Sequence, residues 1–379
     1  MPPLRYRRLL QAAALGLAAL LTLGLSGLLS PRLAPRYTVT DLGVLPGDSA
    51  SRATVLNSRG DVAGFTQGPH RQSCVFQNGA AMSIRGLPGG SDSYALGINS
   101  QGEVIGDSGS LTSHHAFVYS GGKTRALGTL PGFKDSEGAG INDRGEAVGT
   151  ASTSPGPTGF PHQHAFFYRA GRMMDIGTPP GCSESQATSI NAAGQVAGDG
   201  LQTPGRIDQP RPLLYDSRTG TMKMLLMPPA RGGWAFHIND KGQVIGTVWT
   251  HDDRYHVVLW GGGRMRDLGT APGFADSFAQ GLNNRGEAVG FSSEGVPAQD
   301  FKAFLRNHAG GDSALRRYLA RPSERAFVYR EGKMQDLNDL VPKDADWILE
   351  EARGINDRGQ IVGRGLHHGQ ERGFLLTPR

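Results

Sequence analysis

An acidic residue followed by serine recurs along the chain and is the first feature that could carry chemistry. The five copies are Asp48-Ser49, Asp92-Ser93, Asp135-Ser136, Glu184-Ser185 and Asp276-Ser277. A ring of such carboxylates could bind a cation or the hydroxyl groups of a sugar. Asp and Ser also cap backbone amides in turns. Because the pair repeats with the chain's own period, we favour the structural interpretation over a binding site.

Histidines occur as three close pairs, which raises the possibility of a metal site. The pairs are His114 with His115, His162 with His164, and His367 with His368. No cysteine or acidic residue completes a tetrahedral set at a standard spacing. We therefore expect exposed loop histidines, no metal and no cofactor. The sequence also lacks a Gly-x-Ser-x-Gly elbow, a phosphate-binding loop and a His-Glu-x-x-His motif.

A basic stretch, Arg316-Arg317-Tyr318, stands near Arg321 and Arg325. It could meet an acidic partner, although such runs are more often solvated insertions. No catalytic residue can be assigned from these patterns. The candidate ligand-binding rim consists of one set of residues: Asp48, Asp92, Asp135, Glu184, Asp276, Arg316, Arg317 and Tyr318.

These residues belong to an internal repeat. A short strand ending in Asn, followed by a tight turn with Gly, occurs seven times, with the Asn at positions 57, 99, 142, 191, 239, 283 and 356. A period near 45 residues indicates an array of one supersecondary unit. The high glycine content, 56 residues in 379, suits short strands joined by tight turns rather than helices.

One repeat contains four predicted strands. They are His164–Tyr168, Arg172–Ile176, Gln186–Ile190 and Gln195–Gly198, with a Pro-Gly loop after the second and the Asn turn after the third. Four short antiparallel strands per unit are typical of a β-propeller blade. The Gly-rich third and fourth strands are expected near the axis, where backbones crowd together.

The ends of the chain predict how the array closes. Residues 37–43 match the second strand of the unit, and residues 373–376 match the first. Pairing the two ends would complete a blade and remove open sheet edges. The sequence therefore predicts an all-β fold, a seven-bladed β-propeller of four-stranded antiparallel blades. The propeller is expected to be a single domain over 37–379, with a loop insertion at about 293–324.

Strand alternation assigns the loops to two faces. The short turns share one face, while the Pro-Gly loops share the other with the long insertions at 150–163, 199–210, 247–255 and 291–325. Functional residues tend to lie on loops that a rigid scaffold positions. We therefore expect a ligand to bind on the face with the insertions.

Residues 1–36 are expected to export the chain. Basic residues precede an apolar run over 9–29, which is either part of a cleaved signal peptide or a retained membrane anchor. This segment also explains the net charge of +5, since it holds five basic residues and no acid. The neutral remainder argues against nucleic acid as a partner. A disulfide between Cys74 and Cys182 is not expected, because they occupy different repeat positions.

The combined repeat phrase resembles the HAF repeat family of probable extracellular repeat proteins. It consists of His-Ala-Phe at 115–117 and 164–166, followed by Asp-Leu/Ile-Gly, Pro-Gly and Gly-Ile-Asn-x-x-Gly. The resemblance covers nearly everything after residue 36, although the His is replaced at 73, 211 and 325. It implies an exported bacterial protein, extracellular or periplasmic. It supplies no catalytic residues to transfer.

Two functions from different classes follow as hypotheses. The favoured one is an exported binding or scaffold module, acting as a monomer through the loop face on an extracellular glycan, a cell-envelope component or a protein. The alternative is a glycan-active lyase or hydrolase with a site at the propeller axis, an expectation based on fold analogy alone. Acidic or histidine side chains from several blades converging in one place would favour the enzyme.

Overall fold

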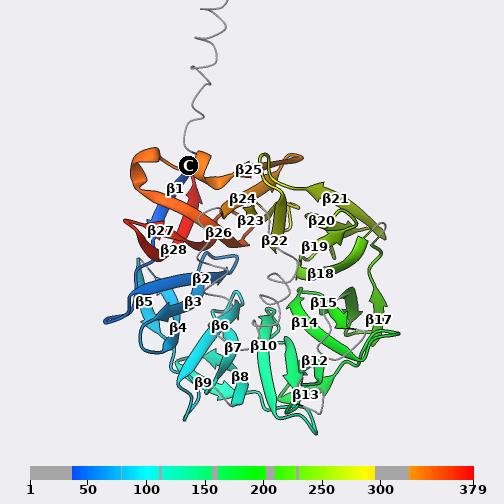
Figure 1. The fold of residues 1–379 in the computed structure, drawn as a ribbon. Coiled ribbons are helices and arrows are strands. Elements are labelled where there is room, and N and C mark those ends of the chain that lie inside the picture. The colour runs from blue at the N-terminus through cyan, green and yellow to red at the C-terminus, as the bar shows by residue number, and fades with distance from the viewer. Residues whose placement is uncertain are drawn as a thin grey trace, which may run out of the picture.

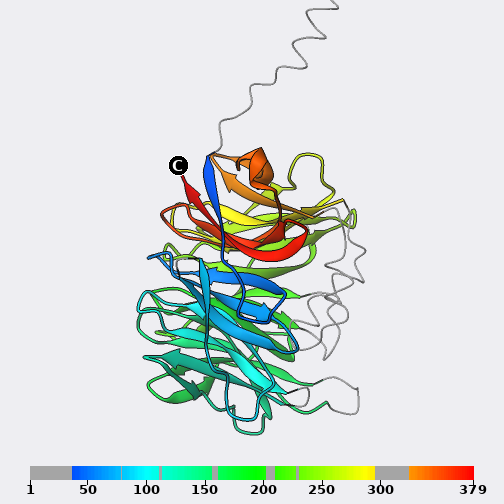
Figure 2. The same ribbon diagram turned by 90° about the vertical axis from the view of Figure 1, so that its left-hand side faces the viewer.

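The computed structural model describes residues 36–77, 79–110, 113–155, 161–201, 210–227, 230–294 and 324–379. Seven four-stranded antiparallel sheets surround a common axis (Figure 1), and the side view shows them as one disc (Figure 2). The predicted seven-bladed propeller is confirmed.

Each blade runs from an inner strand at the axis to an outer strand at the rim (Figure 1). Blades 1 to 3 are formed by β2 (Ala50–Leu56), β3 (Val62–Gln67), β4 (Arg71–Gln77) and β5 (Ala80–Ser83); by β6 (Asp92–Ile98), β7 (Val104–Ser110), β8 (Ser113–Ser120) and β9 (Lys123–Ala126); and by β10 (Asp135–Ile141), β11 (Ala147–Ser152), β12 (Gln163–Arg169) and β13 (Arg172–Asp175).

Blades 4 to 6 continue the same order along the chain. They are formed by β14 (Glu184–Ile190), β15 (Gln195–Leu201), β16 (Arg211–Asp216) and β17 (Thr221–Met224); by β18 (Ala230–Ile238), β19 (Val244–Thr250), β20 (Tyr255–Gly261) and β21 (Arg264–Gly269); and by β22 (Asp276–Leu282), β23 (Ala288–Ser293), β24 (Arg325–Arg330) and β25 (Lys333–Asp336).

Blade 7 contains both ends of the described chain. Its inner three strands are β26 (Trp347–Ile355), β27 (Ile361–His367) and β28 (Gln370–Pro378), and its outer strand is β1 (Tyr37–Asp41). The register pairs Tyr37 with Pro378 and Asp41 with Phe374. The predicted closure is therefore confirmed. Two short 3-10 helices, η2 (Leu337–Asp339) and η3 (Lys343–Ala345), lie between β25 and β26.

The blades begin at a different point in the repeat from the unit chosen in the sequence. The unit 164–198 contains strands of two sheets, because β12 and β13 belong to blade 3 while β14 and β15 belong to blade 4. The Pro-Gly loop crosses from one blade to the next, whereas the insertions join the second and third strands within a blade. A repeat period carries no information on where a unit starts. The Gly-rich strands are the two inner ones, as expected.

The core lies between blades rather than within them. One cluster joins Ile105 and Ala116 of blade 2 with Phe166 and Tyr168 of blade 3. Phe117, Phe166 and Phe374 are fully buried in such clusters. Stability is therefore shared between neighbouring blades, as in other repeat architectures.

Close backbone approach explains the glycine of the second strand. A Cβ placed on Gly106 would lie 1.7 Å from the carbonyl oxygen of Tyr94 on the inner strand. The turn glycines have a different reason, since Gly145, Gly194 and Gly286 have φ values of 69, 79 and 78°. Residues with a Cβ rarely adopt this region.

Several sequence expectations concern the leader, the insertion and the cysteines. Residues 1–35 and 295–323 lie outside the described residues, so the leader with its apolar run at 9–29 and most of the insertion do too. No helix in the described part of the chain is long and apolar enough to cross a membrane. Cys74 and Cys182 are both free thiols.

Candidate functional site

The seven repeat asparagines form a closed ring around the axis. Each side chain donates its Nδ2 to the backbone carbonyl of the corresponding Asn in the next blade, at 2.8–3.2 Å. In each turn the Asn Oδ1 accepts the backbone N–H groups two and four residues further on, as Asn57 does for Arg59 and Asp61. We call this end of the disc the turn face. The Asn amides here are fully used by the fold.

The opposite end, called the insertion face, carries the predicted acidic residues at the start of the inner strands. Asp92, Asp135 and Asp276 each accept a backbone N–H from the third strand of the preceding blade. The donors are Arg71 at 2.8 Å, His114 at 3.1 Å and Tyr255 at 2.9 Å. These carboxylates tie neighbouring blades together, which agrees with the structural interpretation, although the amides belong to another blade and not to their own loop.

The serine of the pair makes a second tie of the same kind. Ser93 and Ser136 accept the N–H groups of Ser73 and Ala116 at 2.9 and 3.0 Å. Ser185 accepts the N–H of Ala165 at 2.9 Å. In blades 2 and 3, both residues of the pair therefore join the blade to the preceding one.

Asp48 does not occupy the same position as the other four acidic residues. In blade 1 it is Ser51 that accepts an N–H from the preceding blade, that of Gly373 at 3.0 Å. Asp48 precedes β2 and accepts the hydroxyl of Thr66 at 2.5 Å. The Asp-Ser match at 48–49 is therefore displaced by two residues from the register of the fold.

Glu184 lies at the shared position but makes no such tie. Its side chain is buried, and its Oε1 atom accepts no hydrogen bond in the described structure. The Nδ1 atom of His162 lies 3.7 Å from Oε1. Burial raises the pKa of Glu184 to about 7. Blade 4 therefore has a buried carboxyl whose Oε1 atom is unpaired, where blades 2, 3 and 6 have an aspartate that accepts a backbone N–H.

Five of the six histidines in these pairs each lie beside one carboxylate, whereas the Nδ1 atom of His115 has no described partner. The Nδ1 atom of His164 lies 2.7 Å from Asp175, and that of His367 lies 2.9 Å from Asp41. Within the described ranges, no three His, Cys, Asp or Glu side chains are arranged to hold a metal ion. Arg316, Arg317 and Tyr318 fall outside the described residues.

The most unusual group of side chains lies one residue further along the inner strands than the acidic-Ser pairs. At each blade interface, a side chain on the second strand of one blade approaches a side chain on the inner strand of the next. Phe65 of blade 1 and Tyr94 of blade 2 show this geometry, with ring centroids 5.3 Å apart. Between blades 2 and 3, the corresponding residues are two carboxylic acids, Asp107 and Glu137.

The surroundings of this carboxyl pair oppose ionisation. Burial raises the pKa of Asp107. Burial, followed by repulsion from Asp107 and Asp135, raises the pKa of Glu137 well above its usual range. Glu137 is only partly buried, and no described residue donates a hydrogen bond to its carboxyl or forms an ion pair with it. Two interacting carboxyls of this kind titrate as a pair.

His114 adds a titratable group beside the pair. Its Nδ1 lies 3.5 Å from an Asp107 carboxylate oxygen. The interaction with Asp107 raises the pKa of His114, so the imidazole carries its positive charge to higher pH. The interface between blades 2 and 3 thus combines the Glu137 carboxyl, which has no described hydrogen-bond partner, with the Asp107 carboxyl and the His114 imidazole.

The other six interfaces are filled differently at these positions. Five combine aromatic, neutral polar or singly charged residues: Phe65 with Tyr94, Thr150 with Gln186, Asp199 with Trp234, Thr247 with Phe278, and Phe291 with Glu351. Asp199, whose pKa burial raises to about 8, accepts the N–H of Ala235 at 2.9 Å.

The sixth, between blades 7 and 1, contains charges that neutralise one another. Buried Arg364 donates to Glu351 at 3.0 Å, to Glu324 at 2.9 Å and to Glu350. Arg52 pairs with Glu371 in the same region. The described residues of the Asp107–Glu137 interface include no arginine of this kind; His114 pairs with Asp107, whereas the Glu137 carboxyl has no described ion pair.

The sequence contained an indication of the Asp107–Glu137 site. Glu137 directly follows the Asp135-Ser136 pair, and the residue after the serine varies between repeats, from Arg52 to Tyr94 to Glu137. Sequence reasoning concentrated on the recurring residues, of which Asp92, Asp135 and Asp276 accept backbone N–H groups of the preceding blade.

The comparisons with known proteins identify the fold. No family model matches the chain, and the search of curated proteins found no match. Among solved structures, an oligogalacturonate lyase from Vibrio parahaemolyticus is 9% identical, with a TM-score of 0.56 over 91% of this chain and 97% of that one. An oligogalacturonate lyase in complex with manganese gives 12% identity and a TM-score of 0.55, covering 92% and 97%.

A third structure, YCF48 bound to D1 peptide, is 9% identical with a TM-score of 0.50, covering 90% of this chain and 95% of that one. At these identities the similarity shows a shared propeller fold. The three structures include glycan lyases and a peptide binder, so the fold does not choose between the two functional classes.

Proposed function

We propose that this chain is an exported binding propeller that takes its ligand at the insertion-face end of the axis, over Asp107, Glu137 and His114. The observation that carries the proposal is the partly exposed carboxyl of Glu137, which has no described hydrogen-bond partner beside a second carboxyl. A ligand that donates hydrogen bonds would satisfy it.

The chemistry of the site indicates the class of ligand. Paired carboxyls accept hydrogen bonds, and an anion beside them would oppose their ionisation further, which disfavours nucleic acid and uronate-rich glycans. Neutral sugars and amino sugars offer hydroxyl and ammonium donors. Export, expected from residues 1–36 and from the HAF resemblance, would bring the protein to such glycans in the cell envelope. A protein partner is the alternative source of donors.

The structure of the turn face supports placing the ligand on the insertion face. The Asn ring uses the turns on that face for the fold, as the closed series from Asn57 to Asn356 shows. The side-chain amides of these seven asparagines therefore have no capacity left for a ligand at the axis. Loops on a rigid scaffold, by contrast, are the usual carriers of binding residues.

The test is a glycan array and calorimetry with the full-length protein, Glu137→Gln and Asp107→Asn. We expect both variants to lose affinity for a neutral or amino-sugar glycan by about tenfold, the cost of one charged hydrogen bond. Glu331→Gln, at an exposed outer turn, is the matched control and should bind normally. Binding that survives both site variants would refute the proposed site.

A second candidate is a glycan-active lyase or hydrolase at the same place. The raised pKa values of Asp107 and Glu137 favour it, because a raised pKa helps a carboxyl to hold the proton that a general acid donates. Incubating the bound glycan with the protein and assaying new reducing ends and unsaturated products decides the question. Turnover that disappears in Glu137→Gln would favour the enzyme, and binding without products would favour the binding module.

A further inference from the structure

The outer hairpin turns, which join the third and fourth strands of a blade, carry basic residues on the turn face. In blade 3 the register places Tyr168 beside Ala147, so the third strand ends next to the Asn turn of the same blade. The basic residues that begin the outer strands are Lys123, Arg172, Arg264 and Lys333. All four are exposed, and none has a described ion pair.

Blade 7 has no outer hairpin, and the two ends of the described chain take its place. Tyr37 pairs with Pro378, and the carbonyl of Arg36 accepts the backbone N–H of Arg379 at 2.9 Å. Arg36 is exposed and lies on the turn face as well. We call one set of residues the basic rim: Arg36, Lys123, Arg172, Arg264 and Lys333.

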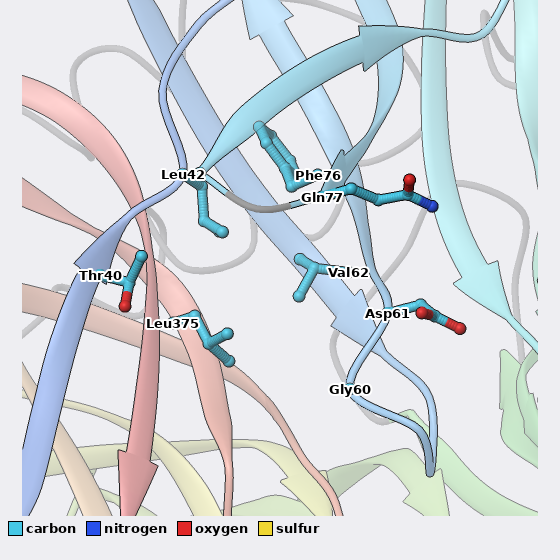
Figure 3. A pocket seen from close by; sticks show the side chains of 9 residues that line it. Thr40, Leu42, Gly60, Asp61, Val62, Phe76, Gln77 and Leu375 are labelled. Atoms are coloured by element: carbon cyan, nitrogen blue, oxygen red, sulfur yellow. The ribbon is translucent and has the colours of Figure 1, made fainter.

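The hairpins do not need these charges in order to form. Blade 1 makes the same two-residue turn with Ala80 in the basic position, because its register pairs Gln77 with Ala80. Figure 3 shows Gln77 at this turn, where it lines a pocket together with Asp61 of the neighbouring inner turn and the core side chains Leu42 and Phe76. The rim is thus interrupted in blade 1 without loss of the turn.

Two of the hairpins bring like charges together. Arg169 stands opposite Arg172 in blade 3, and Arg330 stands opposite Lys333 in blade 6. Like charges at facing positions destabilise a pair of strands. The first base of each pair is balanced by a glutamate of its own blade, whereas the rim residue has no described ion pair. An anionic partner outside the chain would compensate for this repulsion.

The two faces of the disc carry opposite charges at the circumference. Three outer strands begin with a rim residue on the turn face and reach an aspartate three residues later, towards the insertion face. The pairs are Arg172 with Asp175, Arg264 with Asp267, and Lys333 with Asp336. An anionic surface therefore attracts the circumference of the turn face and repels that of the insertion face.

The acids of the turn face belong mostly to the inner turns, near the axis. Three of them pair with an arginine of the same turn, as Asp61 does with Arg59 at 2.8 Å. Three aspartates each accept a backbone N–H of the preceding turn, as Asp143 does from Ser100 at 2.7 Å. Glu331 is the one exposed acid in the described outer turns. A flat anionic surface is therefore contacted through the rim.

We propose that the turn face docks on an anionic phospholipid bilayer through the basic rim. The leader favours a bilayer over an acidic protein as the partner. Residues 30–35 join its apolar run to Arg36, a distance of at most about 25 Å. A retained leader therefore holds the turn face close to the bilayer that it enters. Docking leaves the insertion face, with Asp107 and Glu137, turned away from the lipid.

The test measures partition of the full-length protein into vesicles of phosphatidylglycerol with phosphatidylcholine and into vesicles of phosphatidylcholine alone. The leader has bases of its own, so the readout is how substitutions on the propeller change the preference for the anionic vesicles. The double variant Arg172→Gln/Arg264→Gln should lower this preference at least about fivefold, which is the contribution of one base near such a surface. The difference from the unmodified protein should disappear at high salt.

The matched control is the double variant Arg85→Gln/Arg254→Gln, which removes two exposed arginines on the side of the insertion face. It should leave the preference for anionic vesicles unchanged. An equal loss in the two double variants would overturn the proposal, because the effect would then follow the net charge and not the face. No loss in the rim variant would overturn it as well.

Lysine acetylation followed by mass spectrometry identifies the face that touches the lipid. Anionic vesicles should protect Lys123 and Lys333 from the reagent and leave Lys343, exposed between β25 and β26, reactive. Protection of Lys343 in their place would overturn the proposal. Soluble polyglutamate that protects the two rim lysines when anionic vesicles do not would also overturn it and would indicate an acidic protein as the partner.

Discussion

Asn356 donates its side-chain amide to the backbone carbonyl of Asn57, which lies 299 residues earlier in the chain, at 3.1 Å. This bond closes the Asn ring, because the six other asparagines each reach only the next blade along the sequence. The pairing of β1 with β28 closes the same ring at its outer edge. The propeller is thus closed twice, once at the axis and once at the rim.

The closing asparagine should be costly to remove. Asn356→Ala leaves the N–H groups of Arg358 and Gln360 and the carbonyl of Asn57 without their buried partner. We expect a loss of about 2–4 kcal/mol in the free energy of unfolding, measured by urea denaturation. Ser58→Ala, in the neighbouring turn, serves as the control and should change stability by less than about 0.5 kcal/mol. Equal effects of the two substitutions would contradict the role of the ring.

Closure at the rim predicts the result of a truncation. Deleting residues 370–379 removes β28, which separates β1 from β27 and opens the sheet of blade 7. We expect the whole ring to melt at a lower temperature in one transition, since each blade buries its faces against its neighbours. Calorimetry of the full-length and truncated proteins is the measurement. Melting at the same temperature would show that the closure contributes nothing.

The turn glycines provide a test of backbone geometry. Gly194 has a φ of 79°, and a Cβ there would also lie 2.5 Å from Ser217 Oγ. Gly194→Val should therefore cost more than about 1 kcal/mol in the free energy of unfolding. Ala193→Val, one residue earlier in the same turn, is the comparison and should cost less. Thermal denaturation of both variants distinguishes them.

Buried acids make stability depend on pH near neutrality. Burial raises the pKa of Asp199 to about 8 in the folded state, whereas the pKa of an unfolded aspartate is about 3.9. Between these values the folded state binds the proton that the unfolded state has lost, so stability falls as pH rises towards 8. Glu184, with a pKa of about 7, contributes in the same direction.

His237, whose Nδ1 atom is buried, opposes this trend at lower pH. Burial lowers the pKa of His237 to about 4, so between about pH 4 and 6.5 the unfolded state binds the extra proton and stability rises with pH. The decline should therefore be clearest between pH 6.5 and 8, measured by urea denaturation at fixed ionic strength. Asp199→Asn keeps an oxygen acceptor for the Ala235 N–H and should flatten the decline. An unchanged slope in this variant would exclude Asp199 as its source.

The sequence by itself determined the architecture. The seven Asn-Gly turns, the four strand types and the complementary ends predicted a closed seven-bladed propeller, because each blade depends on local turn chemistry and on strand patterns that recur in every repeat. The positive φ of Gly145, Gly194 and Gly286 followed from the same local rules. Such features require only neighbouring residues.

The tertiary structure alone decided how the blades are divided and which side chains meet. Asp107 and Glu137 are 30 residues apart and belong to different sheets, and their juxtaposition depends on how blade 2 packs against blade 3. The position of Asp48, displaced from the register shared by Asp92 and Asp135, follows from strand pairing in the same way. Periodicity describes what the repeats have in common, whereas a site arises where they differ and touch.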